Sequence, residues 1–413
     1  MTDTYRRLER CRICGSGDLT PLLDLGETPL ANAFVVPDAS DRPEERFPLE
    51  VLRCSVCGLV QLSIVVRADI LFAHYLYATS ASAPMVDHFA SLAEELIRRF
   101  APRGSLVVEV GSNDGVLLRP LRRGGAVVLG IEPAGNLAAQ ANAEGLETWT
   151  EYFATPVARR VADERGRAKV VIANNALAQI DDLRDVAAAL DAVLDDDGVF
   201  VAEVPYLGNL LERVEYDTIY HEHLSYFALA PLEALFSQAG LELFDVRHLA
   251  THGGSIRIYV GRRGAHAPTA ELAAARASER EALLGDAGAY AHFAVRVAAS
   301  RDALRTLLGD LLRAGRPVVG LGATAKSCTL LHYCGIGRDT IAFIGDSTPL
   351  KQGLLTPGTH IPVRPEAAVF DDGPDRVLLL AWNYADAIMR RHAEFIARGG
   401  RFIHPIPLAR LVP

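Results

Sequence analysis

One short segment, Tyr216–Phe227, gathers the side chains best suited to acid–base chemistry. It contains two histidines, two acids and three tyrosines. Histidine titrates near neutral pH, a carboxylate can hold its tautomer, and a tyrosine hydroxyl can donate to a developing oxyanion. The alternatives are a metal chelate at His221-x-His223 and plain packing, since a histidine pair is more often structural. The candidate catalytic residues are His223, Glu222, Tyr220 and His221.

Four of the six cysteines form two C-x2-C pairs in the first sixty residues. Two such pairs, each followed by a glycine, can present four thiolates to one zinc ion. Four thiolates leave no open position for water, so this zinc would be structural rather than catalytic. Two disulfides or a redox pair are the alternatives, and disulfides are disfavoured in a cytoplasmic protein. The candidate ligands are Cys11, Cys14, Cys54 and Cys57.

A glycine turn after the apolar stretch 107–110 predicts a strand, a ligand-binding turn and a helix beginning at Val116. The spacing Gly111-x3-Gly115 lacks the third glycine of a dinucleotide site, and Glu109 stands just before it. This acidic turn suits S-adenosylmethionine (SAM), which carries an ammonium, a sulfonium and a ribose but no phosphate. Glu132 ends the next predicted strand, where an acid can accept both ribose hydroxyls. An NAD site and a turn without a ligand are the alternatives.

Apolar strand candidates alternate with helical stretches in the middle of the chain, at 107–110, 127–131, 170–173 and 199–204. This alternation predicts βαβ units and a parallel sheet, with ligands bound beyond the carboxyl ends of the strands. The third strand then delivers Asn174 and Asn175 to the site, although an asparagine can also cap a helix. The candidate cofactor-binding residues are Glu109, Gly111, Asn113, Asp114, Glu132, Asn174, Asn175 and Gln179.

The last third of the chain predicts a second α/β unit. A helical stretch at 270–314 leads to a strand, a glycine turn and a helix, with further strands at 341–344 and 377–380. Lysines near such a turn can neutralise a diphosphate; the alternative is that this unit only supports the cleft. A glycine turn at 252–255 and an aromatic connector at 73–80 are further places where a ligand can be contacted. The candidate substrate-binding residues are Tyr77, His252, Lys326, Lys351 and Asn383.

The composition bounds the class of protein. The 413 residues are 50% hydrophobic and 23% charged, which is enough for two or three domains with substantial cores. A net charge of −9 argues against a nucleic acid or an anionic membrane as partner. No signal-peptide region and no long apolar run is visible, so we expect a cytoplasmic protein. We also expect a monomer or weak dimer. The expected domains are a zinc-binding module (1–66), a helical connector (67–104), a SAM domain (105–262) and a C-terminal substrate domain (263–413).

Taken in this order, the motifs resemble those of the sugar C-methyltransferases of deoxysugar biosynthesis, which serve natural-product and antibiotic pathways. The likeness covers nearly the whole chain, and its strongest parts are the cysteine module, the glycine turn, Tyr220-His-Glu-His-Leu224 and His252-Gly-Gly-Ser255. It implies an α/β fold with an N-terminal zinc-binding module and two Rossmann-like domains, the first of which binds SAM. It also implies SAM and structural Zn²⁺ as cofactors, and methylation at C-3 of a dTDP-linked 4-keto-6-deoxy sugar through an enolate.

The same resemblance implies that His223 is the base, with Tyr220 and Glu222 as its companions. Relatives often carry histidine where this chain has Gln179, which can form hydrogen bonds but cannot titrate. The alternatives are an O- or N-methyltransferase on the same scaffold, an NAD-dependent nucleotide-sugar oxidoreductase, and a zinc-dependent binding protein without catalysis.

Overall fold

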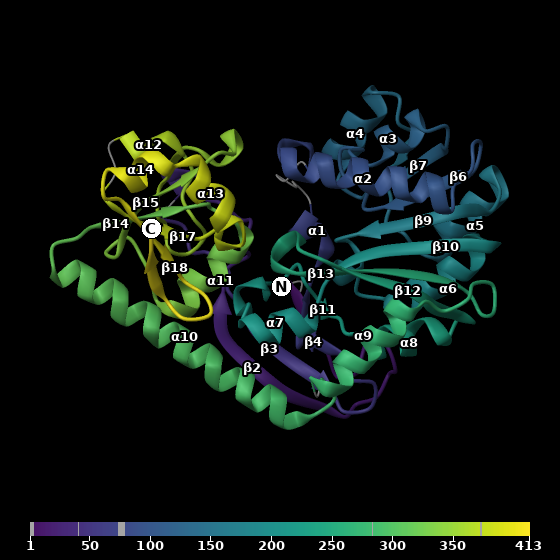
Figure 1. Ribbon diagram of the computed structural model, residues 1–413, viewed down its shortest axis with the longest axis horizontal. Helices are drawn as coiled ribbons and strands as arrows, with labels where there is room; N and C mark the ends of the chain where they lie inside the picture. The colour runs from purple at the N-terminus through teal and green to yellow at the C-terminus, as the bar shows by residue number, and fades with distance from the viewer. Residues whose placement is uncertain (1–3, 40, 73–78, 283, 372–373) are drawn as a thin grey trace.

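The chain folds into two α/β domains that lie side by side, and the N-terminal sheet and the long helix α10 (Ala287–Arg313) run below them in Figure 1. The computed structural model describes residues 4–39, 41–72, 79–282, 284–371 and 374–413. The predicted class, an α/β protein with an N-terminal module and two Rossmann-like units, is confirmed.

The central domain is built on a seven-stranded sheet in the order β12-β13-β10-β9-β6-β7-β8. The four predicted strands are present and pair in parallel, so their carboxyl ends meet at one edge. The sheet is not parallel throughout, because β13 runs antiparallel to both β10 and β12. The strands are β6 (Leu106–Val110), β7 (Val127–Ile131), β8 (Thr148–Trp149), β9 (Ala168–Asn174), β10 (Leu194–Pro205), β12 (Leu241–Leu249) and β13 (Ser255–Arg262).

Helices cover both faces of this sheet (Figure 1), because successive strand residues point to opposite sides. Val107 faces a core that contains Phe89 of α2 (Ala83–Arg99), a helix that sequence analysis assigned to the connector. Val108 faces the other core, which contains residues of α5 and α6. Helix α3 begins at Leu118 rather than at Val116, because Gly115 has a φ of 79° and turn residues follow it. The other helices are α3 (Leu118–Arg123), α4 (Gly135–Ala143), α5 (Thr155–Arg165), α6 (Leu183–Val193), α7 (Leu207–Arg213) and α8 (Leu229–Ser237).

The sheet of the N-terminal module takes its edge strand from elsewhere in the chain. Its order is β11-β4-β3-β2, and β11 (Ser225–Tyr226) lies within the candidate catalytic segment Tyr216–Phe227. Ser225 pairs with Gln61 and Tyr226 pairs with Val60, so the candidate catalytic segment is attached to the module. The module's elements are β1 (Tyr5–Arg7), β2 (Leu19–Thr28), β3 (Phe47–Cys54), β4 (Val60–Leu62), β5 (Ile64–Val66) and α1 (Ala68–Phe72).

The C-terminal domain has a six-stranded sheet in the order β16-β15-β14-β17-β18-β19, with β19 antiparallel to β18. The helical stretch predicted at 270–314 is two helices, α9 and α10, and α10 leads into this domain (Figure 1). The strands are β14 (Val318–Leu321), β15 (Ile341–Asp346), β16 (Val363–Pro365), β17 (Arg376–Leu379), β18 (Arg401–His404) and β19 (Arg410–Val412). The helices of this domain are α11 (Ala325–Cys334), α12 (Ala367–Asp371), α13 (Ala385–Arg391) and α14 (Ala393–Ala397), whereas α9 (Ala270–Glu281) packs against β12 and α8 of the central domain (Figure 1).

Candidate active site and metal centre

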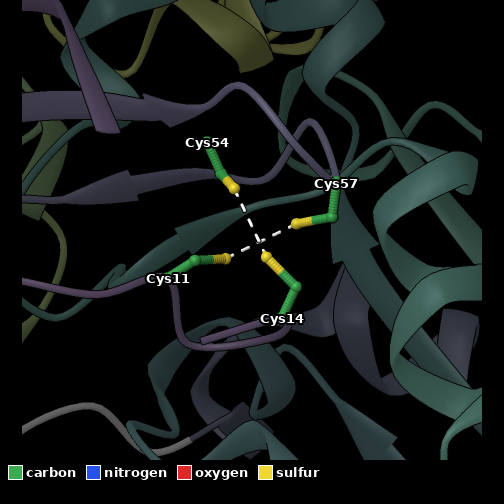
Figure 2. A group of neighbouring side chains, drawn as sticks. All are labelled: Cys11, Cys14, Cys54 and Cys57. Atoms are coloured by element: carbon green, nitrogen blue, oxygen red, sulfur yellow. Dashed lines mark hydrogen bonds between the residues drawn. The ribbon is translucent and has the colours of Figure 1, made fainter. Parts of the chain in front are cut away.

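The four predicted cysteine ligands point toward one centre in the N-terminal module (Figure 2). Their sulfur atoms all lie within 4.8 Å of one another, with 3.4 Å from Cys11 to Cys57 and 3.5 Å from Cys14 to Cys54. A tetrahedral zinc with Zn–S bonds of 2.3 Å requires sulfur separations of roughly 3.8 Å, so the cluster fits one ion. All four are free thiols, which is inconsistent with the disulfide alternative. The bound ion would tie together the two turns that carry these ligands.

One cavity of about 1600 Å³ is lined by all three parts of the chain and collects most of the predicted site residues. Its volume exceeds the roughly 300–1,000 Å³ of a typical small-molecule site, so a cofactor and a second substrate fit together. Of the predicted residues, the cavity is lined by Glu109, Gly111, Asn113, Glu132, Asn174, Asn175, Gln179, Tyr220, Glu222, His223, Lys326, Lys351 and Asn383.

Two of the remaining predicted residues, both described, are not among those that line the cavity. Asp114 is fully buried and does not reach it. His221 is also buried and faces away from it. Tyr77 and the side chain of His252 lie outside the described residues, so their predicted contacts with substrate stay predictions.

The glycine turn after β6 brings backbone to the cavity wall. Gly111 has a φ of 68°, and a Cβ atom there would meet the Cβ of Ala176 at 2.9 Å, so only glycine fits. The backbone N–H of Asn113 donates to Oε2 of Glu132 at 2.8 Å, and the N–H of Ala134 donates to Oε1 at 2.8 Å. The turn and the predicted ribose acid are therefore fixed to each other. Each carboxylate oxygen keeps a second lone pair for a ligand hydroxyl.

Several buried polar atoms in this part of the cavity lack protein partners. Among the described residues, Oε2 of Glu109 and both amide atoms of Asn174 accept or donate no hydrogen bond. Burial raises the pKa of Glu109 well above its usual range and also raises the pKa of Glu132. A buried polar atom without a partner costs about 1–3 kcal/mol, so such atoms on a cavity wall indicate a ligand. The ammonium, sulfonium and hydroxyl groups of SAM fit these acceptors and donors.

His223 is held in one tautomer at the cavity wall. Its Nδ1 lies 3.0 Å from the carbonyl oxygen of Thr218, and because a carbonyl can only accept, Nδ1 carries the proton. In the neutral ring, Nε2 then has the lone pair and accepts from the hydroxyl of Tyr220 at 2.8 Å. The two ring centroids lie 4.1 Å apart. A neutral imidazole in this tautomer, on a residue that lines the cavity, can act as a general base through Nε2.

His221 lies in a different environment from His223, although only one residue separates them. Its Nε2 donates to the carbonyl of Pro48 at 3.2 Å, and its ring packs on Phe47, with 5.6 Å between centroids. Burial lowers the pKa of His221 to about 4, so the ring is neutral. A turn closed by the bond from the His223 N–H to the Tyr220 carbonyl separates the two rings. The structure therefore supports neither a catalytic role for His221 nor a chelate made with His223.

Arg12, which lies between two of the cysteine ligands, was not predicted as a site residue. Its side chain is buried and donates to the carbonyls of Leu62 at 3.3 Å and Leu224 at 3.1 Å. Its Nε donates to Asp181, which lines the cavity, at 3.2 Å. Leu224 directly follows His223, so the metal turn supports the catalytic segment. The sequence offered one sign of this role, an arginine between two closely spaced cysteines. A charged side chain in such a turn must be either solvated or paired.

Asn32 is the second residue that sequence reasoning missed. It lies in the loop between β2 and β3 and lines the cavity. Its Nδ2 donates to Oε1 of Glu222 at 2.6 Å, across 190 positions of the sequence. No motif or spacing marks this asparagine, so only the fold reveals it.

The C-terminal domain meets the catalytic segment through a buried hydrogen bond. The indole N–H of Trp382 donates to Oδ2 of Asp217 at 2.6 Å. Lys326 Nζ lies 5.1 Å from the centre of the same indole ring, within the range of a cation–π contact. Asn383 follows Trp382 and lines the cavity. This contact therefore fixes two predicted substrate residues relative to the segment that carries His223.

Three domain families match the chain in series. Residues 11–72 match a zinc binding domain, residues 86–246 a methyltransferase domain, and residues 250–407 the C-methyltransferase C-terminal domain. Together with the cavity and the cysteine cluster, these matches define a SAM-dependent methyltransferase with a zinc module. Within the described part of the chain, no helix has both the length and the apolarity that crossing a membrane requires.

The chain is 38% identical to the C-methyltransferase NovU of Streptomyces niveus over 414 residues, covering 100% of this chain and 99% of NovU. It therefore belongs to the family of SAM-dependent C-methyltransferases. This membership favours C-methylation over the oxidoreductase, the O- or N-methyltransferase and the protein without catalysis.

Two solved methyltransferase structures each resemble less than half of the chain. One is the methyltransferase in complex with its activator Trm112 from Haloferax volcanii, at 17% identity and a TM-score of 0.37, covering 47% of this chain and 97% of that one. Another is magnesium protoporphyrin IX methyltransferase (ChlM) from Synechocystis with bound SAM, at 15% identity and a TM-score of 0.33, covering 43% and 78%.

Proposed function

We propose that this C-methyltransferase methylates C-3 of a dTDP-linked 4-keto-6-deoxy sugar, as a step in deoxysugar biosynthesis for a natural product. The observation that carries the proposal is the position of His223, which lines the same cavity as the glycine turn and whose Nδ1 is bonded to the Thr218 carbonyl. SAM supplies the methyl group as an electrophile when it is bound. A sugar carbon becomes a nucleophile only after it loses a proton, so this chemistry needs a base in such a position.

In the proposed reaction, the keto group at C-4 acidifies the hydrogen at C-3. His223 takes this proton at Nε2, and the electron pair of the C–H bond becomes part of an enolate. Tyr220 donates to Nε2 in the free site and is well placed to orient the ring or to donate to the substrate. The bond from Nδ1 to the Thr218 carbonyl stabilises the imidazolium that forms. The C-3 carbon then forms its bond to the methyl group.

The nucleotide end of the substrate is assigned to the C-terminal domain. Lys326, Lys351 and Asn383 line the cavity from this domain. Cations inside the cavity of a protein with a net charge of −9 favour an anionic substrate such as a nucleoside diphosphate. Lys326, which lies on the face of Trp382, is assigned to the diphosphate. Lys351 donates to the Ala323 carbonyl at 2.8 Å and interacts electrostatically with Glu222, so it is assigned to the sugar end.

The test combines solvent exchange with methyl transfer. The protein is incubated in D₂O with SAM and a panel of dTDP-linked 4-keto-6-deoxy sugars, and NMR follows deuterium at C-3 and the position of the new methyl group. We expect both events in the parent protein. His223→Asn should lose both by on the order of 10²–10⁴ in rate while still binding SAM.

His221→Asn is the matched control, since its ring contacts β3 rather than the cavity. It should retain exchange and methyl transfer in the folded fraction. A parent protein that accepts no keto-sugar, or that places the methyl group on oxygen, would refute the proposal. Exchange that persists in His223→Asn would assign the base to another residue.

A further inference from the structure

The carboxyl of Glu222 is buried at the wall of the cavity and is held by a residue of the zinc module. Only 4% of Glu222 is exposed, yet it lines the same cavity as His223. Its Oε1 accepts a hydrogen bond from Nδ2 of Asn32 at 2.6 Å. Because Oε1 is engaged as an acceptor, a proton on this carboxyl belongs on Oε2. The fold thus prepares a carboxylic acid whose O–H is left for a partner other than Asn32.

The charges around Glu222 favour the neutral acid near neutral pH. Burial raises the pKa of Glu222 to about 7, while the Asn32 amide and the charge of Lys351 act in the opposite direction. Lys351 is the cation from the C-terminal domain that faces this carboxyl, and its Nζ donates to the Ala323 carbonyl at 2.8 Å. The charge of Lys351 lowers the pKa of Glu222, but burial raises it by more, so the balance favours the neutral acid.

We propose that Glu222, positioned by Asn32, acts as a neutral carboxylic acid that donates a hydrogen bond from Oε2 to the keto oxygen of the substrate. This role rests on the proposed function, because it requires a keto-sugar and an enolate. Glu222 would be a catalytic residue and Asn32 a positioning residue. The zinc module would then contribute directly to the chemistry rather than only to the fold.

The proposed step moves one proton and two electron pairs in forming the enolate. His223 removes the C-3 proton, and the electron pair of that bond moves into the C–C bond while the carbonyl pair moves onto oxygen. The neutral acid stabilises this oxygen, whereas a carboxylate would repel it. C-3 would form its bond to the methyl group as the methyl–sulfur bond of SAM breaks, and that bonding pair would stay on sulfur as a neutral thioether. The carbonyl would re-form, and Glu222 would still hold its own proton. No oxidant, reductant or further co-reactant is needed.

Comparing the variants Glu222→Gln and Glu222→Ala tests whether Glu222 acts as a hydrogen-bond donor or as a base. An amide is neutral at every pH and can still donate, so Glu222→Gln should keep most of the C-3 exchange and methyl transfer. Glu222→Ala should lose on the order of 10²–10³ in kcat, as expected when an oxyanion donor is removed. Glu94→Gln is the matched control, since Glu94 lies exposed on α2.

The pH profile tests the protonation state. In the parent, kcat/KM should fall as the pH rises through about 7, where Glu222 loses its proton. This alkaline limb should vanish in Glu222→Gln. In Asn32→Ala it should move to higher pH, because the amide that favours the carboxylate is gone. A merely structural role for Asn32 would lower the rate without moving the limb.

A direct titration gives a second reading that does not depend on turnover. Carbon-13 NMR of glutamate-labelled protein, compared between parent and Glu222→Gln, should show a carboxyl midpoint near 7 that rises in Asn32→Ala. A midpoint in the ordinary range of glutamate, or a Glu222→Gln variant as inactive as Glu222→Ala, would overturn the inference while leaving His223 and the proposed function intact. A parent protein that turns over no keto-sugar would overturn both.

Discussion

Replacing Arg12 with methionine should loosen the segment that carries His223, although Arg12 lies in the metal turn. The guanidinium donates to the carbonyls of Leu62 and Leu224 at 3.3 and 3.1 Å. Burial lowers the pKa of Arg12 to about 10, so it is still charged at neutral pH and these are charge-assisted hydrogen bonds. Methionine fills much of the same volume but leaves both carbonyls without this donor.

The magnitude follows from these contacts. Both distances are long for hydrogen bonds, so each contributes near the lower end of the range of about 1.5–3 kcal/mol for charged donors. The ion pair with Asp181 adds little, because the Asp181 side chain is 34% exposed. We therefore expect Arg12→Met to lower the free energy of unfolding by about 3 kcal/mol.

The assay is urea unfolding with zinc in excess, combined with hydrogen exchange of the segment 216–226. Arg10→Met is the matched control, because Arg10 is exposed and should change stability by less than about 0.5 kcal/mol. Arg12→Lys should recover part of the loss, since lysine keeps a donor and a charge. The reasoning is refuted if Arg12→Met matches Arg10→Met in stability and in the exchange of this segment.

Three further outcomes are expected. The purified protein should hold one zinc per chain by elemental analysis; Cys54→Ser should lose it and Cys334→Ser should keep it, and a metal-free parent would contradict the assignment. Glu132→Gln should weaken SAM binding in calorimetry by about 1.5–3 kcal/mol, and an affinity equal to that of Glu94→Gln would count against Glu132 as a ligand. The pKa of His221 is about 4 in the folded protein, below its ordinary value of 6.5, so the unfolded chain binds more protons between these values. Stability should therefore fall by up to about 3 kcal/mol as the pH drops from 6.5 to 4, a loss that His221→Asn should not show.

Local rules predicted the parts of the site that are built from neighbouring residues. The cysteine cluster was predictable because each C-x2-C pair presents two thiolates within one turn. The glycine turn was predictable because a position that admits only glycine is visible in the sequence as a glycine. At Gly111 the φ and the close Ala176 side chain impose this restriction. The central strands were predictable because buried parallel strands are continuous apolar runs.

Contacts between distant segments could not be predicted. The bond between Asn32 and Glu222 depends on the packing of the module against the central domain, and neither residue has a local pattern that indicates it. The two histidines were grouped because side chains alternate along an extended chain, which places residues two apart on the same face. The turn at Tyr220–His223 is not extended, so His221 binds the backbone of β3 while His223 lines the cavity. Helix α2 was assigned to a connector because sequence separation alone gives no sign that Phe89 joins the central core.

The strand β11 also bears on how this chain is made and how it can be divided. Residues 60–62 leave the ribosome well before Ser225 and Tyr226, which pair with them. During that interval β4 is the edge of the module's sheet, with unpaired backbone groups and buried-type side chains at Val60 and Leu62. Such an edge can pair with another chain. A fragment ending near residue 66 would keep its zinc ligands but also this open edge, and is therefore expected to self-associate rather than to behave as an independent domain.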